Sequence, residues 1–568
     1  MSVEFGFNEA TKLLAKPTGL KTKEVFALLE TPPDQSLGNI AFPCFSLAKE
    51  RKKSPMQIAM DIIHTLDVSK SALFIDAKPQ GPYVNLFFDK AEFSKQVLSC
   101  ISKEKSRFGF KKPNKKVVVL ESPSPNTNKP LHIGHVRNMV LSESVSRILE
   151  SQGYRVKPVN LNNDRGIHIC KSMLAYQLWG KNKKPDKKSD HFVGDYYVLF
   201  SQKAKEHEEL QKEAQDMLVK WENNDPEVRA LWKKMNAWAL DGFYETYKRF
   251  GLKFDKEYFE SDIYERGKKL VLDGVKKGVF KKREDGAVII DLGKPLGEKV
   301  LLRADGTSVY ITQDLYLAKQ KYADFHYDQS LYVVANEQDY HFKVLFEILN
   351  MLKLKAAKGV RHLSYGMIGL PTGRIKSREG TTVDADDLLD ELAKKAQVEL
   401  EKRKGITKKQ MSVLSEKIGL GALRYYILKY SAHKDFVFKP DESISFEGET
   451  GPYLQYALVR AKRIEHKVGK KTAKPQMSAL SNPESQALIH YLARFPFVVE
   501  ESANRHSPHT IAEYAFLLAS KFNAFYEKNS VLHARGGVQT ARLKLVNAYV
   551  HVLSSCLSLL AIEPVEKM

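Results

Sequence analysis

The pattern of hydrophobic and polar positions changes sharply between residues 117 and 149. Residues 117–120 form a short apolar run, which is typical of a buried parallel strand. Residues 122–130 are rich in proline, serine and asparagine, so they cannot continue a strand and they predict a turn. From Leu131 apolar residues return at helical spacing, which predicts a helix that starts beside His132 and His135. The predicted order is strand, turn and helix start.

This order of elements suits the binding of an anion such as phosphate. The first turn of a helix carries unpaired backbone N–H groups and a partial positive charge. His132 and His135 can donate hydrogen bonds, and Lys129 adds a charge nearby. Gly134 lets a flat group such as a nucleobase approach the backbone. Ordinary helix-start histidines are the plainer alternative, but the strand–turn–helix setting favours a nucleotide site.

Two further apolar runs predict loops at the same edge of a sheet. Residues 155–162 predict a strand that ends before the turn Asp164-Arg165-Gly166, and residues 331–335 predict another that Gln338 follows. In a dinucleotide-type fold, ligands bind beyond the carboxyl ends of the parallel strands. We therefore expect these loops to lie together, although the asparagines near residue 160 can also be plain turn formers.

A small α/β module precedes this central part. Residues 46–66 predict a helix and residues 83–88 predict a strand. A basic linker, residues 111–116, contains Pro113 and separates the module from the strand at residue 117. We therefore expect a first domain over residues 1–110.

An insertion and a helical end complete the predicted organisation. Between about residues 180 and 278 a charged loop and Lys- and Glu-rich helical stretches interrupt the central pattern. Alternating charges over residues 202–221 are typical of a solvated helix face. Asp384 is expected to cap a long helix, and the chain beyond residue 411 is almost wholly helical. The expected second and third domains are residues 111–404, which contain the insertion, and residues 405–568.

Composition limits the class of protein. The chain has 568 residues, of which 43% are hydrophobic, and a mean hydropathy of -0.38, which suits a soluble protein of several domains. No apolar run of membrane-spanning length and no leader at Met1 are recognised, so we expect a cytoplasmic location. The four cysteines lie far apart without metal-type spacing, which predicts reduced structural residues and no tightly bound protein metal.

The charge of the chain points to a polyanionic partner. The formal net charge is +22 and the isoelectric point is near 9.4. Neutralising phosphates releases counterions and strengthens association with a nucleic acid. A solubility surface is the alternative explanation, and charge alone does not choose RNA over DNA.

The string LHIGH at residues 131–135 resembles the HIGH motif of class I aminoacyl-tRNA synthetases. The flanking ESPSPN at residues 121–126 and Lys129-Pro130 resemble arginyl-tRNA synthetases in particular, and the resemblance extends over essentially the full chain. It implies an α/β multidomain fold. That fold has a small α/β N-terminal domain, a Rossmann-type parallel-sheet catalytic domain with insertions and an all-helical C-terminal anticodon-binding domain.

The resemblance also implies a pocket for arginine. A guanidinium is planar, permanently charged and rich in donors, so a selective pocket needs a carboxylate and further fixed acceptors. Tyr310 and Asp314 are four residues apart and share a face if Tyr310 opens a helix. Taken alone, a capping Asp314 and a core Tyr310 are the plainer interpretation. The resemblance implies guanidinium contacts at Glu260, Tyr310 and Asp314 and contacts to the amino-acid end at Asn126, Gln338 and Glu121.

Residues 373–382, GRIKSREGTT, resemble the second nucleotide loop of class I enzymes, KMSKS. The loop departs from that pattern, because Arg374 stands at the first lysine, Lys376 at the serine and Ser377 at the second lysine. Arginyl enzymes often carry a lysine just before HIGH, as Lys129 does here, which implies that Lys129 neutralises the transition state. The implied ATP contacts are His132, Gly134, His135, Lys376 and Ser377, and the implied catalytic residues are Lys129, His132, His135, Lys376 and Arg378.

Two other segments resemble tRNA-contacting parts of the family. Residues 81–87 resemble the end of the additional N-terminal domain, which touches the tRNA elbow, and residues 446–456 resemble the start of the anticodon-binding domain. Aromatic side chains interleaved with a cation can stack on splayed RNA bases, although a packed helix face is the plainer alternative. The implied tRNA contacts are Gln80, Tyr83, Asn85, Tyr453, Tyr456, Arg460, Tyr526 and Met568.

The resemblance implies an arginine–tRNA ligase. ATP, as its Mg²⁺ complex, would activate L-arginine to arginyl-adenylate, and the 3′ end of tRNA(Arg) would take the arginine. We expect a monomer without a membrane partner. Three alternatives stay open: another class I synthetase such as the cysteinyl enzyme, whose zinc-ligand spacing is missing here; a plain nucleotidyltransferase, which would leave most of the chain unused; and a tRNA-binding paralogue without catalysis.

Overall fold

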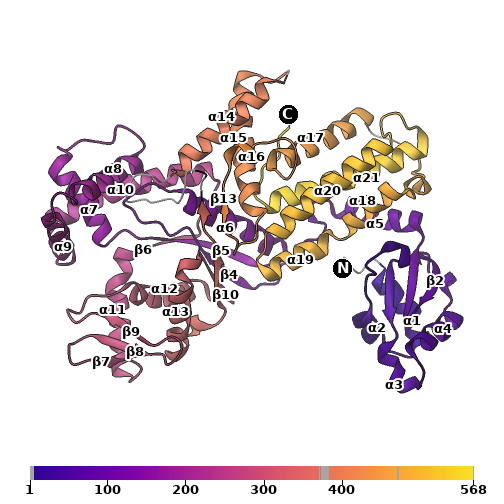
Figure 1. The fold of residues 1–568 in the computed structure, drawn as a ribbon, viewed down its shortest axis with the longest axis horizontal. Helices are drawn as coiled ribbons and strands as arrows, with labels where there is room; N and C mark the ends of the chain where they lie inside the picture. The colour runs from indigo at the N-terminus through magenta and orange to yellow at the C-terminus, as the bar shows by residue number, and fades with distance from the viewer. Residues whose placement is uncertain (1–5, 370, 372–382, 404, 470–472, 567–568) are drawn as a thin grey trace.

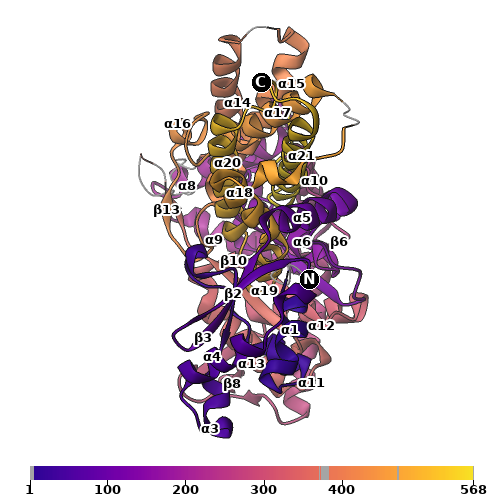
Figure 2. The ribbon, with the colours of Figure 1, turned by 90° about the vertical axis from the view of Figure 1, so that its right-hand side faces the viewer.

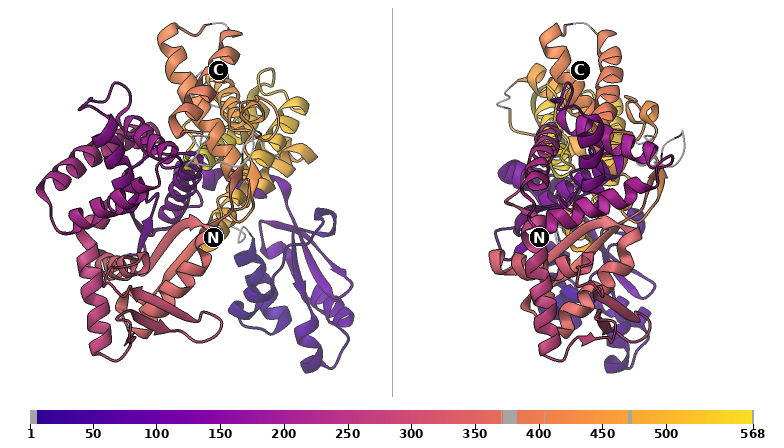
Figure 3. Two further views of the ribbon diagram at one scale, coloured as in Figure 1. Left: turned by 60° about the vertical axis from the view of Figure 1, so that its left-hand side comes forward. Right: turned by 90° about the vertical axis from the view of Figure 1, so that its left-hand side faces the viewer.

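The chain folds into a central parallel sheet, a group of long helices at the C-terminal end and a small N-terminal module (Figure 1). The computed structural model describes residues 6–369, 371, 383–403, 405–469 and 473–566. The N-terminal module lies beside the C-terminal helices, far from the helices of residues 189–249 (Figures 2 and 3). This arrangement confirms the expected α/β multidomain class.

The central sheet has five parallel strands in the order β11-β10-β4-β5-β6. Its middle strand β4 is the apolar run at residue 117, and Val118 and Val119 are fully buried, as expected of a strand covered on both faces. The prediction of strands at residues 117, 155 and 331 is confirmed. The bounds are β4 Val117–Glu121, β5 Arg155–Asn162, β6 Lys256–Phe259, β10 Gln329–Ala335 and β11 Val360–Tyr365.

All strand ends that carry candidate site residues meet at one edge of this sheet. Since the pairs are parallel, the carboxyl ends of β4, β5, β6 and β10 point the same way. The residues that follow these strands therefore gather on one side, as predicted. The helices beside the sheet are α6 Ile133–Ser151, α7 Ile167–Trp179, α11 Glu260–Lys276, α12 Tyr310–Phe325 and α13 Asp339–Met351.

A small antiparallel sheet lies between α11 and α12 along the chain, although these two helices pack against each other, and a short parallel pair follows the main sheet. The small sheet packs Val288, Ile290 and Leu301 against α12. Its strands are β7 Lys281–Lys282, β8 Val288–Asp291 and β9 Glu298–Leu302, and the short pair is β12 Ile368–Gly369 with β13 Phe436–Val437.

The insertion forms a helical layer on α7. Its helices are α8 Ser189–Lys203, α9 Glu209–Glu222 and α10 Pro226–Arg249. The solvated helix face predicted within residues 202–221 is confirmed for α9, but the helical stretch is interrupted and α9 also has a buried face. Residues 204–208 break the stretch, and α9 buries Leu210, Ala214, Met217 and Trp221 at the spacing of an amphipathic helix.

The C-terminal part is helical, as predicted. Helices α14 and α15 form a hairpin at the top of Figure 1, and Asp384 caps α14 by accepting from the N–H of Asp386. The domain division after residue 404 stays a prediction. The helices are α14 Ala385–Glu401, α15 Lys408–Leu428, α16 Pro440–Ser443, α17 Gly451–Val468, α18 Pro483–Ala493, α19 Phe495–Arg505, α20 His509–Lys528 and α21 Gly536–Leu559.

The N-terminal module packs helices on an antiparallel sheet of order β1-β3-β2. The strand predicted at residues 83–88 is confirmed as β3, but the single helix predicted over residues 46–66 is wrong. Ser54 accepts a hydrogen bond from the N–H of Gln57 and Pro55 follows, so a new helix starts there. The elements are α1 Phe7–Thr18, α2 Thr22–Leu28, β1 Ile40–Pro43, α3 Ala48–Arg51, α4 Pro55–Thr65, β2 Phe74–Gln80 and β3 Tyr83–Phe88. Helix α5 Lys90–Glu104 follows and packs against the C-terminal helices α18 and α21.

The cysteines are reduced and mostly buried. Cys44, Cys170 and Cys556 are buried, Cys100 is half-buried, and all four are free thiols. Burial raises the pKa of the Cys44 thiol to about 11, so the thiol is protonated near neutral pH. Among the described helices, none combines the length and apolar character needed to cross a membrane.

Arg137 connects α6 to two segments that are distant in sequence. The side chain is buried and its guanidinium donates to four backbone carbonyls, of Gly366, Met367, Ala432 and Lys434. These carbonyls flank the short strands β12 and β13. Arg137 therefore holds α6 against the joint between the central sheet and the C-terminal helices.

The Arg137→Met variant tests this role of Arg137. Methionine leaves four backbone carbonyls without their charged donor, so we expect the free energy of unfolding to fall by about 3 kcal/mol or more. Urea unfolding followed by circular dichroism measures this change. The control is Arg155→Met at the exposed start of β5, for which we expect a change below about 0.5 kcal/mol. Equal losses in the two variants would contradict the role assigned to Arg137.

Candidate active site

The candidate nucleotide site lies where β4 ends and α6 begins. His132 is the N-cap of α6, and the turn before it is fixed to the end of β5. The N–H of Ser124 donates to Asn160 Oδ1 at 3.1 Å, and the N–H of Asn163 donates to the carbonyl of Pro125 at 2.9 Å. The loops after β4 and β5 therefore lie together.

The two histidines have a defined tautomer. His132 Nδ1 accepts from the N–H of Gly134, and His135 Nδ1 accepts from the N–H of His132, both at 3.1 Å. A neutral imidazole has one donor and one acceptor nitrogen. Because both Nδ1 atoms accept, both rings carry their proton on Nε2 and can donate it. The ring centroids are 4.0 Å apart, so the rings lie next to each other.

Both imidazoles are neutral at physiological pH. Burial, together with the nearby Lys129 ammonium, lowers the pKa of His132 to about 3. Burial, His132 and Lys129 lower the pKa of His135 well below its ordinary value. Lys129 is therefore close to both rings. In this turn the full positive charge belongs to Lys129, while the histidines offer neutral donors beside the helix start.

The backbone of this motif pairs with the start of α14. The N–H of Ile133 donates to the carbonyl of Val383 at 3.2 Å, and the N–H of Ala385 donates to the carbonyl of Leu131 at 2.9 Å. The predicted second nucleotide loop directly precedes Val383. Its predicted residues, Arg374, Lys376, Ser377 and Arg378, lie outside the described residues.

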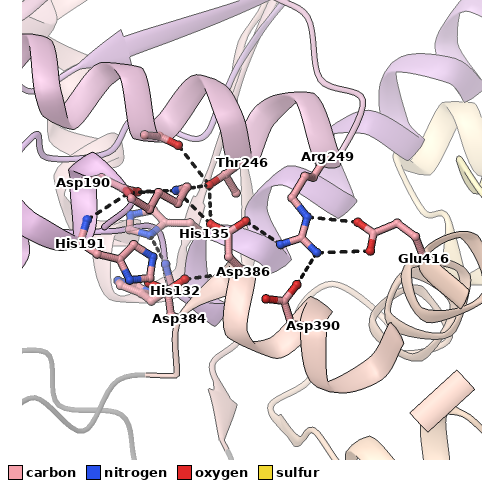
Figure 4. Close-up of polar contacts among 12 residues, drawn as sticks. His132, His135, Asp190, His191, Thr246, Arg249, Asp384, Asp386, Asp390 and Glu416 are labelled. Carbon is pink, nitrogen blue, oxygen red and sulfur yellow. Dashed lines mark hydrogen bonds and ion pairs between the residues drawn. The ribbon is translucent and has the colours of Figure 1, made fainter. Parts of the chain in front are cut away.

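A polar network then fixes the start of α14 to the insertion (Figure 4). Asp386 accepts from Thr246 Oγ1 at 2.7 Å, from Lys188 Nζ at 3.0 Å and from Arg249 Nη1 at 3.0 Å. Burial raises the pKa of Asp386, but these three partners outweigh it and the pKa is lowered. Lys188 also pairs with the fully buried Asp190 at 2.8 Å. The insertion thus holds α14, and through it the HIGH motif, in place.

One cluster in the described part of the chain has the residue types of a metal site. It consists of His191, Asp384 and Asp386, whose ligand atoms lie within 4.8 Å of one another. The Lys188 ammonium and the Arg249 guanidinium already contact Asp386, and His191 Nε2 lies 3.4 Å from Asp384 Oδ2. The side chains of the protein therefore supply the positive charge at this cluster.

The predicted guanidinium contact Glu260 is the first residue of α11. It is only 5% exposed. Its Oε1 accepts from Gln313 Nε2 at 3.3 Å and lies 3.5 Å from Arg165 Nη1. Burial raises the pKa of Glu260 to about 7, with Asp164 and Asp314 adding to the rise and Arg165 opposing it. Such a carboxyl favours a cationic guest, because a neighbouring cation stabilises its ionised form.

Tyr310 and Asp314 lie near Glu260. Tyr310 opens α12, as predicted, and most of its side chain is exposed. Partial desolvation of the hydroxyl and the charge of Glu260 raise its pKa. Asp314 lies one turn later and its Oδ2 is 2.6 Å from His341 Nε2. Burial opposes protonation of His341, but the bond to Asp314 raises its pKa. Two carboxyls and one hydroxyl are thus gathered in one region.

The residues predicted to contact the amino-acid end of arginine differ in their exposure to solvent. Asn126 and Gln338 are exposed in the loops after β4 and β10. Glu121, in contrast, is buried, and its Oε2 pairs with Lys321 Nζ at 2.6 Å. The sequence reasoning missed Lys321, Arg165 and His341. Their partners are distant in sequence, so no local spacing pointed to these pairs.

The predicted tRNA contacts are partly accessible. Gln80 is exposed and Tyr83 is half-buried against Phe45, whereas Asn85 is buried and donates to the carbonyl of Leu37 at 2.7 Å. Asn85 therefore shapes the end of the module and does not face solvent.

The predicted face on α17 pairs cations with half-buried rings. Arg460 lies over Tyr526 at 4.8 Å, and Arg403 lies 5.2 Å from the ring centroid of Tyr456. The hydroxyl of Tyr453 accepts from Asn523 Nδ2 at 2.9 Å. Tyr453, Tyr456 and Arg460 share one helix face, as predicted. Met568 lies outside the described residues.

Comparison with known proteins gives matches along the whole chain. Residues 7–88 match the arginyl tRNA synthetase N-terminal domain, residues 96–439 match the class I (R) tRNA synthetase catalytic domain and residues 454–568 match the DALR anticodon-binding domain. The arginine–tRNA ligase of Treponema denticola is 44% identical over 95% of this chain and 94% of its own length. That of Bacteroides thetaiotaomicron is 40% identical over 97% of each chain.

Solved structures agree with these sequence matches. The Thermus thermophilus arginyl-tRNA synthetase superposes with a TM-score of 0.81 and 26% identity, covering 99% of each chain. A Mycobacterium tuberculosis methionyl-tRNA synthetase shares the fold, with a TM-score of 0.51 at 11% identity over 78% of this chain and 91% of its own. The sheet, the HIGH motif and the helical end define a class I aminoacyl-tRNA synthetase. Within that class, the chain belongs to the arginyl-tRNA synthetase family.

The His132→Asn variant tests the assignment of the histidine donors. Asparagine can keep an acceptor for the N–H of Gly134 but loses the Nε2 donor. We expect the rate of pyrophosphate–ATP exchange to fall by about 10²-fold, with the melting temperature nearly unchanged. An exchange rate within twofold of the wild type would show that His132 does not contribute to the reaction.

The acid sensitivity of folding follows from the same imidazole. The unfolded chain binds a proton at His132 near pH 6.5, whereas the folded chain resists protonation until the pH nears 3. Stability is therefore lost as pH falls below 6.5, by about 2 kcal/mol at pH 5 for this group. Urea unfolding at pH 7 and pH 5 should show a smaller loss for His132→Gln than for the wild type. Equal losses would contradict the lowered pKa.

Proposed function

We propose that the chain activates L-arginine with ATP and transfers it to the 3′ end of tRNA(Arg). In the first step, an oxygen of the arginine carboxylate attacks the α-phosphate and pyrophosphate leaves. In the second step, a ribose hydroxyl at the tRNA end attacks the acyl carbon and AMP leaves. The observation that carries this proposal is the carboxylate pocket of Glu260 and Asp314 on the same sheet edge as the HIGH motif.

The phosphate half of the site acts by charge and position. We assign to His132 and His135 the donation of Nε2 hydrogen bonds to phosphate oxygens, which their Nδ1 contacts support. Lys129 neutralises charge that develops at the α-phosphate. ATP enters as its Mg²⁺ complex, and Gly134 lets the nucleotide approach. Lys376, Ser377 and Arg378 of the second loop assist in binding the phosphates. No covalent intermediate with the protein is needed.

The carboxylate half of the site selects the side chain of the amino acid. Glu260 and Asp314 pair with the guanidinium and the Tyr310 hydroxyl adds an acceptor, which satisfies a planar group with several donors. Lysine would leave buried acceptors without partners, at about 1–3 kcal/mol each. Asn126 and Gln338 are exposed at the sheet edge and hold the amino-acid end, while Glu121 is positioned by Lys321.

The remaining domains are proposed to bind tRNA. Gln80 and Tyr83 would contact the elbow, and Tyr453, Tyr456, Arg460 and Tyr526 would stack on or pair with anticodon bases, with Met568 nearby. The net charge of +22 supports a polyanionic partner. One chain carries the catalytic part and both parts proposed to bind tRNA, and we propose that it acts as a monomer. Its reduced cysteines suit the cytoplasm.

Pyrophosphate–ATP exchange tests this function. We expect exchange only with arginine, and we expect tRNA to stimulate it. Asp314→Asn should raise the KM for arginine by about 10²-fold, because one charge-assisted contact is lost, and leave the KM for ATP nearly unchanged. The control Asp441→Asn changes an exposed carboxylate far from the sheet edge and should have no effect. Tight tRNA binding without exchange by any amino acid would support the non-catalytic RNA-binding alternative instead.

A further inference from the structure

Arg165 is a buried cation beside Glu260 and has no part in the reaction described above. Its side chain is 7% exposed. The guanidinium lies 4.3 Å from the ring centroid of Tyr264 and 5.5 Å from that of Trp221. Its Nη2 is 2.5 Å from Glu222 Oε1, and its Nη1 is 3.5 Å from Glu260 Oε1. Arg165 is thus held between two rings and two carboxylates.

Side chains of the insertion hold the Arg165 guanidinium in place. Trp221 lies between Arg165 and Arg229, whose guanidinium is 3.5 Å from the Trp221 ring centroid and whose Nε donates to the Trp221 carbonyl at 2.8 Å. Trp232 Nε1 donates to the carbonyl of Asp164 at 2.6 Å, so the turn that carries Arg165 is held as well. A stacked guanidinium with a fixed backbone has little freedom to leave Glu260.

The same turn also fixes the start of α11. Asp164 accepts from the N–H of Ser261 at 2.8 Å and from Ser261 Oγ at 2.6 Å. Arg165 contacts the preceding residue, Glu260. Two successive residues of the turn after β5 therefore hold two successive residues at the start of α11. This double contact sets the direction of the Glu260 carboxylate.

We propose that Arg165 is a positioning residue for arginine recognition, which favours the ionised form of Glu260 and directs one of its oxygens at the substrate guanidinium. This inference rests on the proposed function. Within the part of the chain that the structure describes, the polar side-chain contacts of Glu260 come from Arg165 and Gln313, and both fall on Oε1. We assign the other oxygen, Oε2, to the substrate. Glu222 balances the charge of Arg165, so Glu260 and Asp314 still present negative charge to an incoming cation.

The electrostatics of the pocket agree with this role. Burial raises the pKa of Glu260 to about 7 even though Arg165 opposes the rise. Without Arg165 the pKa would be higher, and Glu260 would be largely protonated at pH 7. Arginine would then bind weakly at neutral pH, and the affinity for arginine would recover as the pH rises. A residue that only supports the fold would not produce such a pH dependence.

The experiment measures the KM for arginine and for ATP at pH 7 and pH 9 in the full-length protein. We expect Arg165→Gln to raise the KM for arginine about fivefold to tenfold at pH 7 and less than about twofold at pH 9, with the KM for ATP unchanged. Arg165→Lys keeps the charge and should restore most of the binding at pH 7. The matched control is Arg229→Gln, which removes the other guanidinium on Trp221 and should show no pH-dependent defect.

Two results would overturn the proposal. One is an equal defect of Arg165→Gln at both pH values, and the other is an Arg165→Lys variant as impaired as Arg165→Gln at pH 7. If Arg165→Gln does not fold, the Arg165→Lys variant is the test by itself. A large rise in its KM for arginine that is the same at pH 7 and pH 9 would show a purely structural role and overturn the proposal.

A readout without turnover separates this proposal from the proposed function. Calorimetry of L-arginine binding in buffers of different ionisation enthalpy counts the protons released. The wild type should release protons at pH 7 as Glu260 ionises, and Arg165→Lys should change that number little. Arginine binding with proton release but without exchange would refute the proposed function and leave the role of Arg165 intact. Arg165→Gln should release more protons than the wild type, because its Glu260 carries more bound proton before arginine binds, and equal release by the two proteins would contradict the role of Arg165.

Discussion

Pairing of buried carboxylates with internal cations is the constraint on which this site depends. An unpaired buried charge costs several kcal/mol, so each carboxylate needs a cation from elsewhere in the chain. Glu121 has Lys321, Asp386 has Lys188 and Arg249, and Glu260 has Arg165. Each pair joins segments that are distant in sequence. These ion pairs form only when the sheet, the insertion and α14 are correctly placed relative to one another. The pairs therefore stabilise that one arrangement.

This charge arrangement separates two opposite tasks within one site. At the helix start, neutral histidines and Lys129 provide donors and positive charge for phosphate. After the carboxyl end of β6 and in the first turns of α12, Glu260 and Asp314 provide negative charge for a guanidinium. The carboxylates outside the substrate pocket are already compensated, so they do not compete for the substrate cation. Selectivity for arginine therefore depends on the carboxylates that remain available to pair with the substrate cation.

The sequence predicts what is locally encoded and misses what is held by distant partners. Strand β4 and the start of α6 at the histidines follow from apolar spacing. The shared face of Tyr310 and Asp314 follows from their four-residue separation, because Tyr310 opens α12. The break between α3 and α4 is also encoded locally, by the capping residue Ser54 and the proline that follows it. Arg165 could not be assigned, since its partners Glu222 and Glu260 lie on helices whose packing no short motif predicts.

The most direct test of this account compares arginine with citrulline in tRNA aminoacylation. Citrulline has nearly the same shape, but a neutral urea group replaces the guanidinium, so it cannot pair with Glu260 and Asp314. The account predicts a kcat/KM for arginine that is higher by about 10³-fold or more, because neither carboxylate finds a cation in citrulline. A ratio within about tenfold would show that charge pairing with the carboxylates does not select the substrate, and would contradict the account.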